Sequence, residues 1–417
     1  MSAFSSRDAA DPDIAVIGGG IAGGALAAAA ARAGLRVLVL ERTLRHEDRV
    51  RGEFMPAWGV QEAHALGVLD VFLAAGGNWV RHYVGYGEDI DARAAEARPL
   101  RLDRLLPDVA GALTFGHPQV CTALNDAAVA AGAELVRGVT DVEVRPGSPP
   151  TLSMHRAGQG TTVLHPRLVV AADGRGSRVA RAIGAEVHSE EPGHLLCGLL
   201  VDGAGDWPED RITIGTEGEL VFYVFPQGAG RIRLYACYSR EQRGRFSGEG
   251  NVGRLLDAFR LTSVPGAAAL AEARPIGPCH GYPTGDTWID QPGAEGVVLI
   301  GDAAGHNCPS VGQGVSIALR DARHVLAALL DGGWSPAAFR AYCDERGERM
   351  RRLRFSARLF RDLRADFSPE GRARRQRVRD KAAADPSVLH PLVATQMGPY
   401  AVPPEAFTQA ARDRLLG

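Results

Sequence analysis

The sequence predicts an α/β protein in which helices cover a mostly parallel sheet and a second, antiparallel β domain is inserted. Three observations predict it. A strand-helix-strand pattern opens the chain at residues 14–40, and short alternating strands fill residues 194–240. A strand, a glycine-rich turn and a helix then return at residues 297–330. Because this return completes a pattern begun at the N-terminus, the first domain is expected to be discontinuous.

The opening pattern is a β-α-β unit. Residues 14–17 form a short apolar run, which Gly18, Gly19 and Gly20 break. Residues 21–33 have the small side chains of a closely packed helix that ends at Gly34, and residues 36–40 form the next apolar run. Parallel strands joined in this way need cover on both faces, so a Rossmann-like sheet is expected.

The remaining elements follow from periodicity and from breaks at glycine and proline. Strand alternation is clearest at residues 220–225 and 232–236, and a long arginine-rich helix is expected at 336–366, with an irregular remainder. Further helices are expected at 60–75, 119–132 and 251–260, and further strands at 78–103, 134–144 and 151–172.

These elements predict a domain plan with interleaved parts. The expected divisions are a disordered lead at 1–12, a nucleotide-binding domain at 13–77, 104–185 and 276–335, a substrate-binding β domain at 78–103 and 186–275, and C-terminal helices with a tail at 336–417.

Composition narrows the class of protein. The 417 residues carry a net charge of −2, which argues against a nucleic-acid partner, and six scattered cysteines without a C-x-x-C pair favour a reduced cytoplasmic protein without a metal site. Residues 14–31 are uncharged, but they are rich in Gly and Ala and follow acidic residues, so neither a membrane span nor a signal peptide is expected. A homodimer is a possible assembly.

The first motif is a dinucleotide turn. Gly18-x-Gly20-x-x-Gly23 follows a strand and opens a helix, so Gly18 allows the turn, Gly20 admits a pyrophosphate and Gly23 packs the helix on the strand. The helix N-terminus offers N–H groups to the phosphates. Glu41 ends the second strand and can accept hydrogen bonds from a ribose. This motif alone does not distinguish FAD from NAD.

Two later segments favour a flavin. Gly301-Asp302 follows the strand at 297–300 and leads to Pro309-x-x-Gly312-Gln313-Gly314 before a helix. A strand-end carboxylate suits a ribityl hydroxyl, and N–H groups at a helix start suit the anionic edge of a reduced flavin. Asp173-Gly174 follows a further apolar strand, at 168–172.

With these three motifs in order, the sequence resembles the class A flavoprotein monooxygenases, the family of para-hydroxybenzoate hydroxylase, over about residues 12–365. Arg51-Gly52-Glu53, Gln119 and Arg42 also resemble family segments near the flavin, although solvated side chains are the alternative. The FAD contacts expected from the motifs and the resemblance are Gly18, Gly20, Ile21, Ala22, Gly23, Glu41, Arg42, Arg51, Gln119, Asp173, Gly301, Asp302, Pro309, Gly312, Gln313, Gly314 and Val315.

The resemblance implies a reaction as well as a cofactor. It implies that NADH or NADPH reduces FAD, that O₂ gives a flavin C4a-hydroperoxide, and that this hydroxylates or epoxidises a small aromatic or polyketide-like substrate. The chain departs from the family pattern at three positions: Gly305, with His306 beside it, stands where many relatives have histidine, Ser316 where asparagine is usual, and Ala180 where arginine is common. The Ala180 departure bears on the nicotinamide, because its segment is linked in the family to both FAD and NAD(P)H.

The catalytic residues expected are few, because the cofactor carries the chemistry. Pro309 would shape the oxygen-reacting edge of the flavin. His82, Tyr223 and Tyr235 are the candidates carried forward for a general base acting on a phenol, beside Tyr83, Tyr238 and His280. For each of these aromatic or histidine residues, core packing is the competing interpretation.

Other functions stay open. A flavin-dependent halogenase would resemble this chain, but the only lysine is Lys381 and no Trp-x-Trp occurs. A reductase of the prenyl-reductase type is the main alternative. A flavin-holding scaffold without redox turnover is a third.

Overall fold

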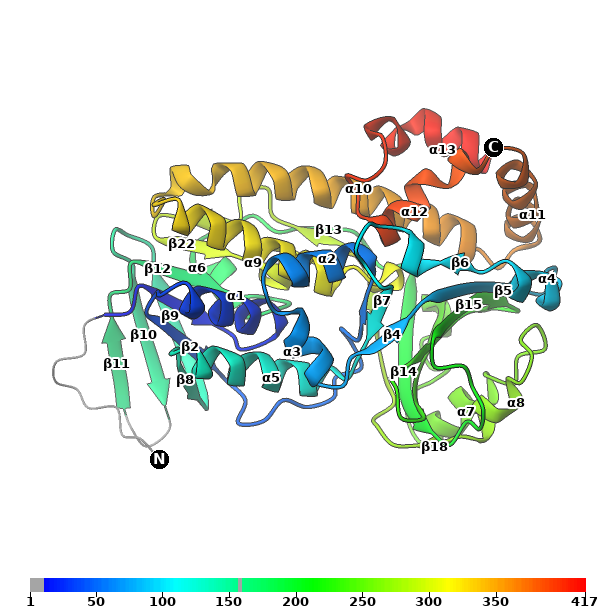
Figure 1. Cartoon of the computed structure of the whole chain (residues 1–417), viewed down its shortest axis with the longest axis horizontal. Helices are drawn as coiled ribbons and strands as arrows, with labels where there is room; N and C mark the ends of the chain where they lie inside the picture. The colour runs from blue at the N-terminus through cyan, green and yellow to red at the C-terminus, as the bar shows by residue number, and fades with distance from the viewer. Residues whose placement is uncertain (1–10, 157–159) are drawn as a thin grey trace.

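The computed structural model describes residues 11–156 and 160–417 and places them in two large sheets and three smaller ones, with helices packed around them (Figure 1). Of the expected disordered lead at 1–12, residues 1–10 lie outside the described residues, and Asp11 and Pro12 precede the first strand as coil. Within the described residues, no helix combines the length and the apolar character needed to cross a bilayer.

The first sheet has six strands in the order β21-β22-β12-β1-β2-β8. Its parallel strands are β1 (Ile14–Ile17), β2 (Val37–Glu41), β8 (Glu134–Arg137), β12 (Leu168–Ala171) and β22 (Val297–Leu299), and β21 (Gly293–Ala294) pairs antiparallel at the edge. Strands β1, β2, β12 and β22 are buried along their whole length, as continuous apolar runs in a covered parallel sheet should be. The predicted α/β class with a mostly parallel sheet is confirmed.

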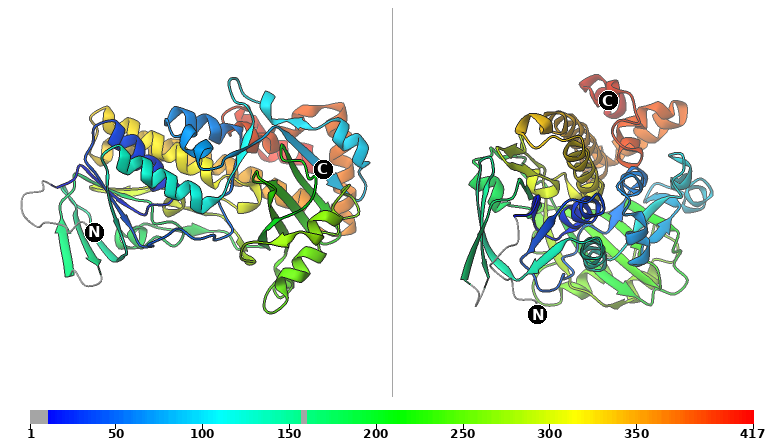
Figure 2. Two further views of the ribbon diagram at one scale, coloured as in Figure 1. Left: turned by 60° about the horizontal axis from the view of Figure 1, so that its bottom comes forward. Right: turned by 60° about the vertical axis from the view of Figure 1, so that its left-hand side comes forward.

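Different layers cover the two faces of this sheet (Figure 2). One face packs on α1 (Ile21–Arg32), α5 (His117–Ala130) and α9 (Gly314–Leu330). The other packs on an antiparallel sheet of β9 (Val139–Arg145), β10 (Thr151–Arg156) and β11 (Gly160–Leu164), with α6 (Arg178–Ala182) beside it.

A short three-stranded sheet connects the two halves of the molecule. It consists of β3 (Phe54–Met55), β7 (Ala112–Thr114) and β4 (Asn78–Val80). The single helix expected at 60–75 is wrong: Gly67, at φ 71°, lies between α2 (Ala57–Ala65) and α3 (Leu69–Ala74). Glycine adopts this left-handed backbone without strain, so the chain turns there.

The second sheet has eight strands and is largely antiparallel. The path runs β18-β14-β17-β16-β15-β5-β6, with β19 also paired to β14. The strands are β5 (His82–Gly87), β6 (Leu100–Arg101), β14 (His194–Asp202), β15 (Arg211–Glu217), β16 (Leu220–Pro226), β17 (Arg231–Ser239), β18 (Arg274–Pro275) and β19 (His280–Thr284). One face packs on α7 (Asn251–Asp257) and α8 (Ala268–Glu272), and α4 (Ala92–Ala97) lies between β5 and β6 in the chain.

The C-terminal part is more helical than expected. After α10 (Arg340–Arg364) come α11 (Pro369–Ala384), α12 (His390–Met397) and α13 (Gln409–Leu416), so the expectation of an irregular remainder is wrong. The arginine- and alanine-rich sequence of α11 has little apolar periodicity, and only Gly371 and Val378 of this helix are buried. Periodicity therefore gave no sign of this helix. A small sheet of β13 (His188–Ser189) and β20 (Thr287–Trp288) completes the fold.

Candidate functional site

One cavity of about 760 Å³ reaches from the carboxyl ends of the parallel strands to the inner face of the eight-stranded sheet. We call the part lined by the loops after β1, β2, β12 and β22 the cradle. We call the part lined by β14–β17 and the helices α10–α12 the chamber. Among the predicted FAD contacts, those that line the cavity are Gly18, Gly20, Ile21, Ala22, Glu41, Arg42, Arg51, Asp173, Asp302, Pro309, Gly312, Gln313, Gly314 and Val315.

Sheet topology explains why segments so far apart in sequence meet. β1 lies between β12 and β2, and β22 follows β12, so the loops carrying Gly18, Asp173 and Asp302 leave neighbouring strands at one edge. In open α/β sheets this edge, where the strand order reverses, is where ligands bind.

The three glycines of the first turn have different surroundings. A Cβ on Gly18 would lie 2.4 Å from the carbonyl oxygen of Ala172, and one on Gly23 would lie 1.9 Å from that of Gly18. A Cβ on Gly20 would meet no atom within 4 Å, and Gly20 lines the cavity. Gly18 and Gly23 therefore allow close packing of the backbone, whereas Gly20 leaves room for a ligand at the uncapped start of α1.

Glu41 is held in place at the end of β2. Its carboxylate accepts hydrogen bonds from the N–H of Gly19 at 2.7 Å and from the N–H and hydroxyl of Thr43 at 2.7 and 2.6 Å. Burial alone would raise the pKa of Glu41, but these hydrogen bonds outweigh it and lower the pKa. A fixed, ionised acceptor at this point suits a ribose hydroxyl.

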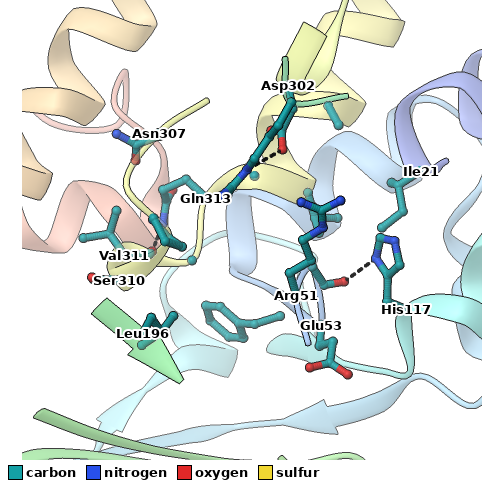
Figure 3. Close-up of a pocket in the computed structure, with 18 of the residues that line it drawn as sticks. Ile21, Arg51, Glu53, His117, Leu196, Asp302, Asn307, Ser310, Val311 and Gln313 are labelled. Atoms are coloured by element: carbon teal, nitrogen blue, oxygen red, sulfur yellow. Dashed lines mark hydrogen bonds and ion pairs between the residues drawn. The ribbon is translucent and has the colours of Figure 1, made fainter. Parts of the chain in front are cut away.

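Asp302 and Arg51 lie in the cradle (Figure 3), and Arg175 pairs with Asp302 there. The Nε–H of Arg175 donates to its carboxylate at 3.2 Å, and Arg51 lines the same wall. Burial, and then the charge of Arg175, lowers the pKa of Arg51. Two arginines and one carboxylate have a net positive charge, which favours phosphate oxygens nearby. The carboxylate of Asp302 can still accept a hydrogen bond from a hydroxyl, because it has more lone pairs than Arg175 uses.

The loop after β22 is fixed by contacts from far along the chain. Arg346 donates to the carbonyl oxygens of Ala304, Gly301 and Gly305 at 2.8, 3.1 and 2.9 Å, and Asp321 accepts from the N–H of Gly301 at 2.8 Å. Gly301 is therefore occupied inside this network and does not line the cavity.

A second set of contacts holds the segment that leads to Pro309. Asp286 accepts from the side chain of Asn307 at 2.5 Å and from the N–H of Cys308 at 2.9 Å. Burial raises the pKa of Asp286 to about 6, against the lowering effect of these two hydrogen bonds. The loop shape at Pro309 thus depends on a carboxyl group from a distant segment.

Gln313 and Gly314 end this loop at the start of α9. The side chain of Gln313 accepts from the indole N–H of Trp58 at 2.9 Å and donates to the carbonyl oxygen of Thr395 at 3.0 Å. It therefore fixes the loop and leaves only backbone to face the cavity. A Cβ on Gly314 would meet no atom within 4 Å, and no side chain caps the helix, so its first N–H groups stay available to a ligand.

The helix α5 contributes a different residue from the one predicted. Gln119 is exposed and does not line the cavity, whereas His117 and Cys121 of the same helix do. His117 Nδ1 lies 3.2 Å from the carbonyl oxygen of Gly52, and burial lowers its pKa to about 4. Its sequence context contains no motif, so only the fold could have pointed to it.

The chamber is lined largely by apolar and aromatic side chains on the inner face of the eight-stranded sheet. These are Tyr83, Leu196, Ile212, Ile214, Tyr223, Phe225, Tyr235 and Tyr282, and Phe54 of β3 joins them. Tyr223 and Tyr235 are opposite one another on β16 and β17. The hydroxyl of Tyr223 has no hydrogen-bond partner among the described residues, while that of Tyr235 donates to Glu53 at 2.6 Å.

Glu53 joins the two halves of the molecule through a buried ion pair. Its Oε2 lies 2.7 Å from Nε of Arg233, which also donates to Asp48 at 2.6 Å, and Gln227 donates to Glu53 at 3.0 Å. Glu53 lines the cavity (Figure 3). Removing one partner of a buried pair costs about 3–5 kcal/mol, so this network fixes the cradle to the chamber.

The other candidate residues lie apart. His82 does not line the cavity and contacts Asp210 at 3.1 Å. Tyr238 packs on Phe246 at the opposite face of the sheet, and His280 is exposed. The structure therefore brings together Pro309, Tyr223 and Tyr235, with Tyr83 beside them, and does not bring His82 to the same place.

Comparison with known proteins settles the family. Residues 11–354 match the model of the FAD-binding domain family. The chain belongs to this family. FAD is therefore its cofactor, and the predicted resemblance to the class A flavoprotein monooxygenases is confirmed at the level of family and fold.

Individual relatives are distant. Mouse squalene monooxygenase is 24% identical over 330 residues, which cover 77% of this chain and 55% of the mouse protein, so the chain spans about half of that relative. Menaquinone reductase of Mycobacterium tuberculosis strain H37Rv is 26% identical over 335 residues, 76% of each chain. The crystal structure of p-nitrophenol 4-monooxygenase PnpA from Pseudomonas putida has a TM-score of 0.77 at 20% identity and covers 98% of this chain and 99% of its own.

Proposed function

We propose that this protein is an FAD-dependent monooxygenase that uses NADH or NADPH and O₂ to hydroxylate or epoxidise a small aromatic or polyketide-like molecule. The observation that carries the proposal is the continuity of the cavity. The cradle, with its dinucleotide turn, opens directly into the aromatic chamber, and the loop from Pro309 to Gly314 lies where the two meet. A ring bound by that loop would face a substrate across a short distance.

FAD, when bound, supplies the redox and oxygen chemistry, and the chain supplies binding and shape. The backbone from Gln313 to Val315, at the uncapped start of α9, offers N–H groups to an anionic ring edge. Pro309 lines the cavity beside them and limits how closely other groups approach. The apolar lining of the chamber favours exclusion of water, which protects reactive oxygen species from side reactions.

The two chamber tyrosines act better as donors than as bases. Burial raises the pKa of both Tyr223 and Tyr235 well above the ordinary value, so both stay protonated near neutral pH. Tyr235 already donates to Glu53. The buried hydroxyl of Tyr223 meets the geometry of a hydrogen bond with no described residue, although Ser310 lies close enough to act on its pKa, and a buried polar group without a partner costs about 1–3 kcal/mol. We infer that Tyr223 donates to a carbonyl or hydroxyl oxygen of the substrate.

The test begins with the purified protein. It should be yellow, contain stoichiometric FAD, and oxidise NADH or NADPH with matching O₂ consumption that rises when the right compound of an aromatic and polyketide panel is added. Product analysis should show one added oxygen atom that derives from O₂. Reduction that never leads to oxygen incorporation would contradict the proposal.

Reduction of a quinone or prenyl chain is the second candidate. It is favoured by the similarity to menaquinone reductase over 76% of both chains. An anaerobic experiment separates the two functions, because a reductase passes its electrons to the substrate without O₂. Reoxidation of the reduced protein by a menaquinone analogue under nitrogen would support the reductase.

A further inference from the structure

The chamber extends beyond the aromatic residues to a wall made by the C-terminal helices. This wall includes Leu363 at the end of α10, Val378 and Ala382 on α11, and Leu392 and Val393 on α12. Ile90, near α4, and Leu100, on β6, line the same cavity, and Figure 1 shows α11 near β5 and β6. This outer part is therefore mostly apolar.

Three arginines interrupt that apolar wall. Arg364, Arg375 and Arg379, which we call the arginine group, all line the cavity. Within residues 11–156 and 160–417, none of the three forms an ion pair with a carboxylate, although Asp89 is near enough to influence Arg379. Charged groups that leave bulk water are ordinarily paired.

Three neighbouring arginines on α11 are paired with carboxylates. On α11, Arg372 pairs with Glu88 at 3.4 Å, Arg374 with Asp366 at 3.0 Å and Arg377 with Glu370 at 2.8 Å. The carboxylates near the end of α10 are therefore already used on the outside of the helix. On α11, the side that faces the cavity is therefore left with positive charge in excess.

The members of the group have different contacts. Arg375 donates to the carbonyl oxygens of Leu363 and Asp366 at 3.3 and 2.7 Å, so it holds the end of α10. Arg379 donates to the neutral side chain of Gln376, and no hydrogen bond from the Arg364 guanidinium is found in the described part of the chain. Burial and then the charge of Arg364 lower the pKa of Arg375, which shows that the like charges interact.

We propose that the substrate is amphipathic and that its acidic group, a carboxylate or a phosphate, binds between Arg364 and Arg379 while its apolar body extends toward Tyr223. This inference rests on the proposed function, because it identifies the class of molecule that the chamber accepts. Guanidinium groups suit both anions, since each presents paired N–H donors that match two oxygens. An anion there would also relieve the repulsion within the arginine group.

The experiment measures binding to the FAD-loaded protein by calorimetry, without nicotinamide and without turnover. The probes are decanoate, dodecanoate and tetradecanoate, dodecyl phosphate, and dodecanol as the uncharged member of the same shape. We expect at least one anion of the series, a fatty acid or dodecyl phosphate, to bind about tenfold tighter than dodecanol. Comparing the affinity of the fatty acids with that of dodecyl phosphate then identifies whether the acidic group is a carboxylate or a phosphate.

Variants then locate the anion. Arg364→Gln and Arg379→Gln should each weaken binding of the preferred anion about tenfold and leave dodecanol unchanged. Arg377→Gln is the matched control, because this arginine lies on the same helix outside the cavity. Melting temperatures of all three variants show whether the fold is kept.

Three results would overturn the inference: equal affinity for anions and alcohol, undiminished anion affinity in both variants, or no binding by any acid or phosphate of the series. Failure of the proposed function is distinguished separately. It would appear as absent oxygen incorporation in a protein whose preference for anions is intact.

Discussion

The cradle is built of backbone and small residues, whereas the chamber is built of large side chains. In the cradle Gly20 and Gly314 leave the backbone open to the cavity at the starts of α1 and α9, while the N–H of Gly18 donates to the carbonyl oxygen of Leu40 and fixes the turn. In the chamber, side chains from β14 to β17 meet side chains from α10 to α12, which lie more than a hundred residues later in the chain.

This difference corresponds to a difference in task. A cofactor of constant shape is held by backbone geometry, which few sequences can provide and which motifs therefore reveal. A substrate of particular shape is held by side chains, whose neighbours depend on the whole tertiary structure. Substitutions should therefore affect FAD in the cradle and substrate or stability in the chamber.

The largest effect should come from Gly20→Leu. No atom lies within 4 Å of a Cβ at this position, so the folded protein accommodates the side chain while the pyrophosphate does not. Loss of several charge-assisted hydrogen bonds should weaken FAD binding about a hundredfold or more. FAD content after purification and titration of the apoprotein measure it.

The matched control is Gly347→Leu, at an exposed site on α10 where a Cβ also meets nothing within 4 Å. It should retain FAD fully. Equal FAD content in Gly20→Leu and the wild-type protein would show that the cradle is not the FAD site.

The next effect concerns the support under Pro309 and depends on pH. Burial raises the pKa of Asp286 from 3.8 to about 6, so the folded state prefers the protonated form. The stability from this preference is fully present below the unfolded pKa and is lost as the pH rises through about 6. The side chain of Asp286→Asn cannot ionise. The free energy of unfolding of this variant should therefore match that of the wild-type protein near pH 4 and exceed it by about 1–3 kcal/mol above neutral pH.

Urea unfolding across this pH range measures the difference. Asp290→Asn is the control, since Asp290 is exposed and contacts only His188 among the described residues. A gain for Asp286→Asn that is the same at every pH would contradict the assignment of the effect to ionisation.

A smaller effect is expected at the end of β22. Asp302→Ala removes an acceptor for a ribityl hydroxyl and leaves Arg175 without its 3.2 Å partner. One hydrogen bond to a charged group is worth about 1.5–3 kcal/mol, so FAD affinity should fall roughly tenfold or more. Asp206→Ala, at an exposed loop outside the cavity, should leave affinity unchanged. Full FAD affinity in Asp302→Ala would place the ribityl chain elsewhere.

The sequence predicted the cradle well because its parts are local. Each motif is a strand end followed by a turn and a helix start, and the parallel order of β12, β1 and β2 brings those ends together. What holds the motifs was not predictable. Arg346 reaches the loop after β22 from α10, and Asp286 reaches it from the turn between β19 and β20, with no motif linking either residue to the loop.

The chamber was predicted only as a class of structure. Alternation indicated the strands but gave no face, and the partners of Tyr223, Tyr235 and Tyr238 depend on which side of the sheet each one occupies. The arginine-rich α11 lacks the apolar stripe by which helices are found in sequence. Its place in the cavity wall follows from its packing against α10 and α13.

The last comparison separates the two chamber tyrosines, of which Tyr223 should have the smallest effect on stability. Tyr235→Phe removes the 2.6 Å hydrogen bond to buried Glu53 and should cost about 1–3 kcal/mol in the free energy of unfolding. Tyr223→Phe removes a hydroxyl without a protein partner and should stay within about 0.5 kcal/mol of the wild-type protein. Because Tyr223 is expected to contact substrate, its variant should instead raise KM a few-fold for the compound found in the panel, with FAD content unchanged. The two variants thus serve as controls for each other, and equal destabilisation by both would mean that Tyr223 has a structural bond and no hydroxyl free for a substrate.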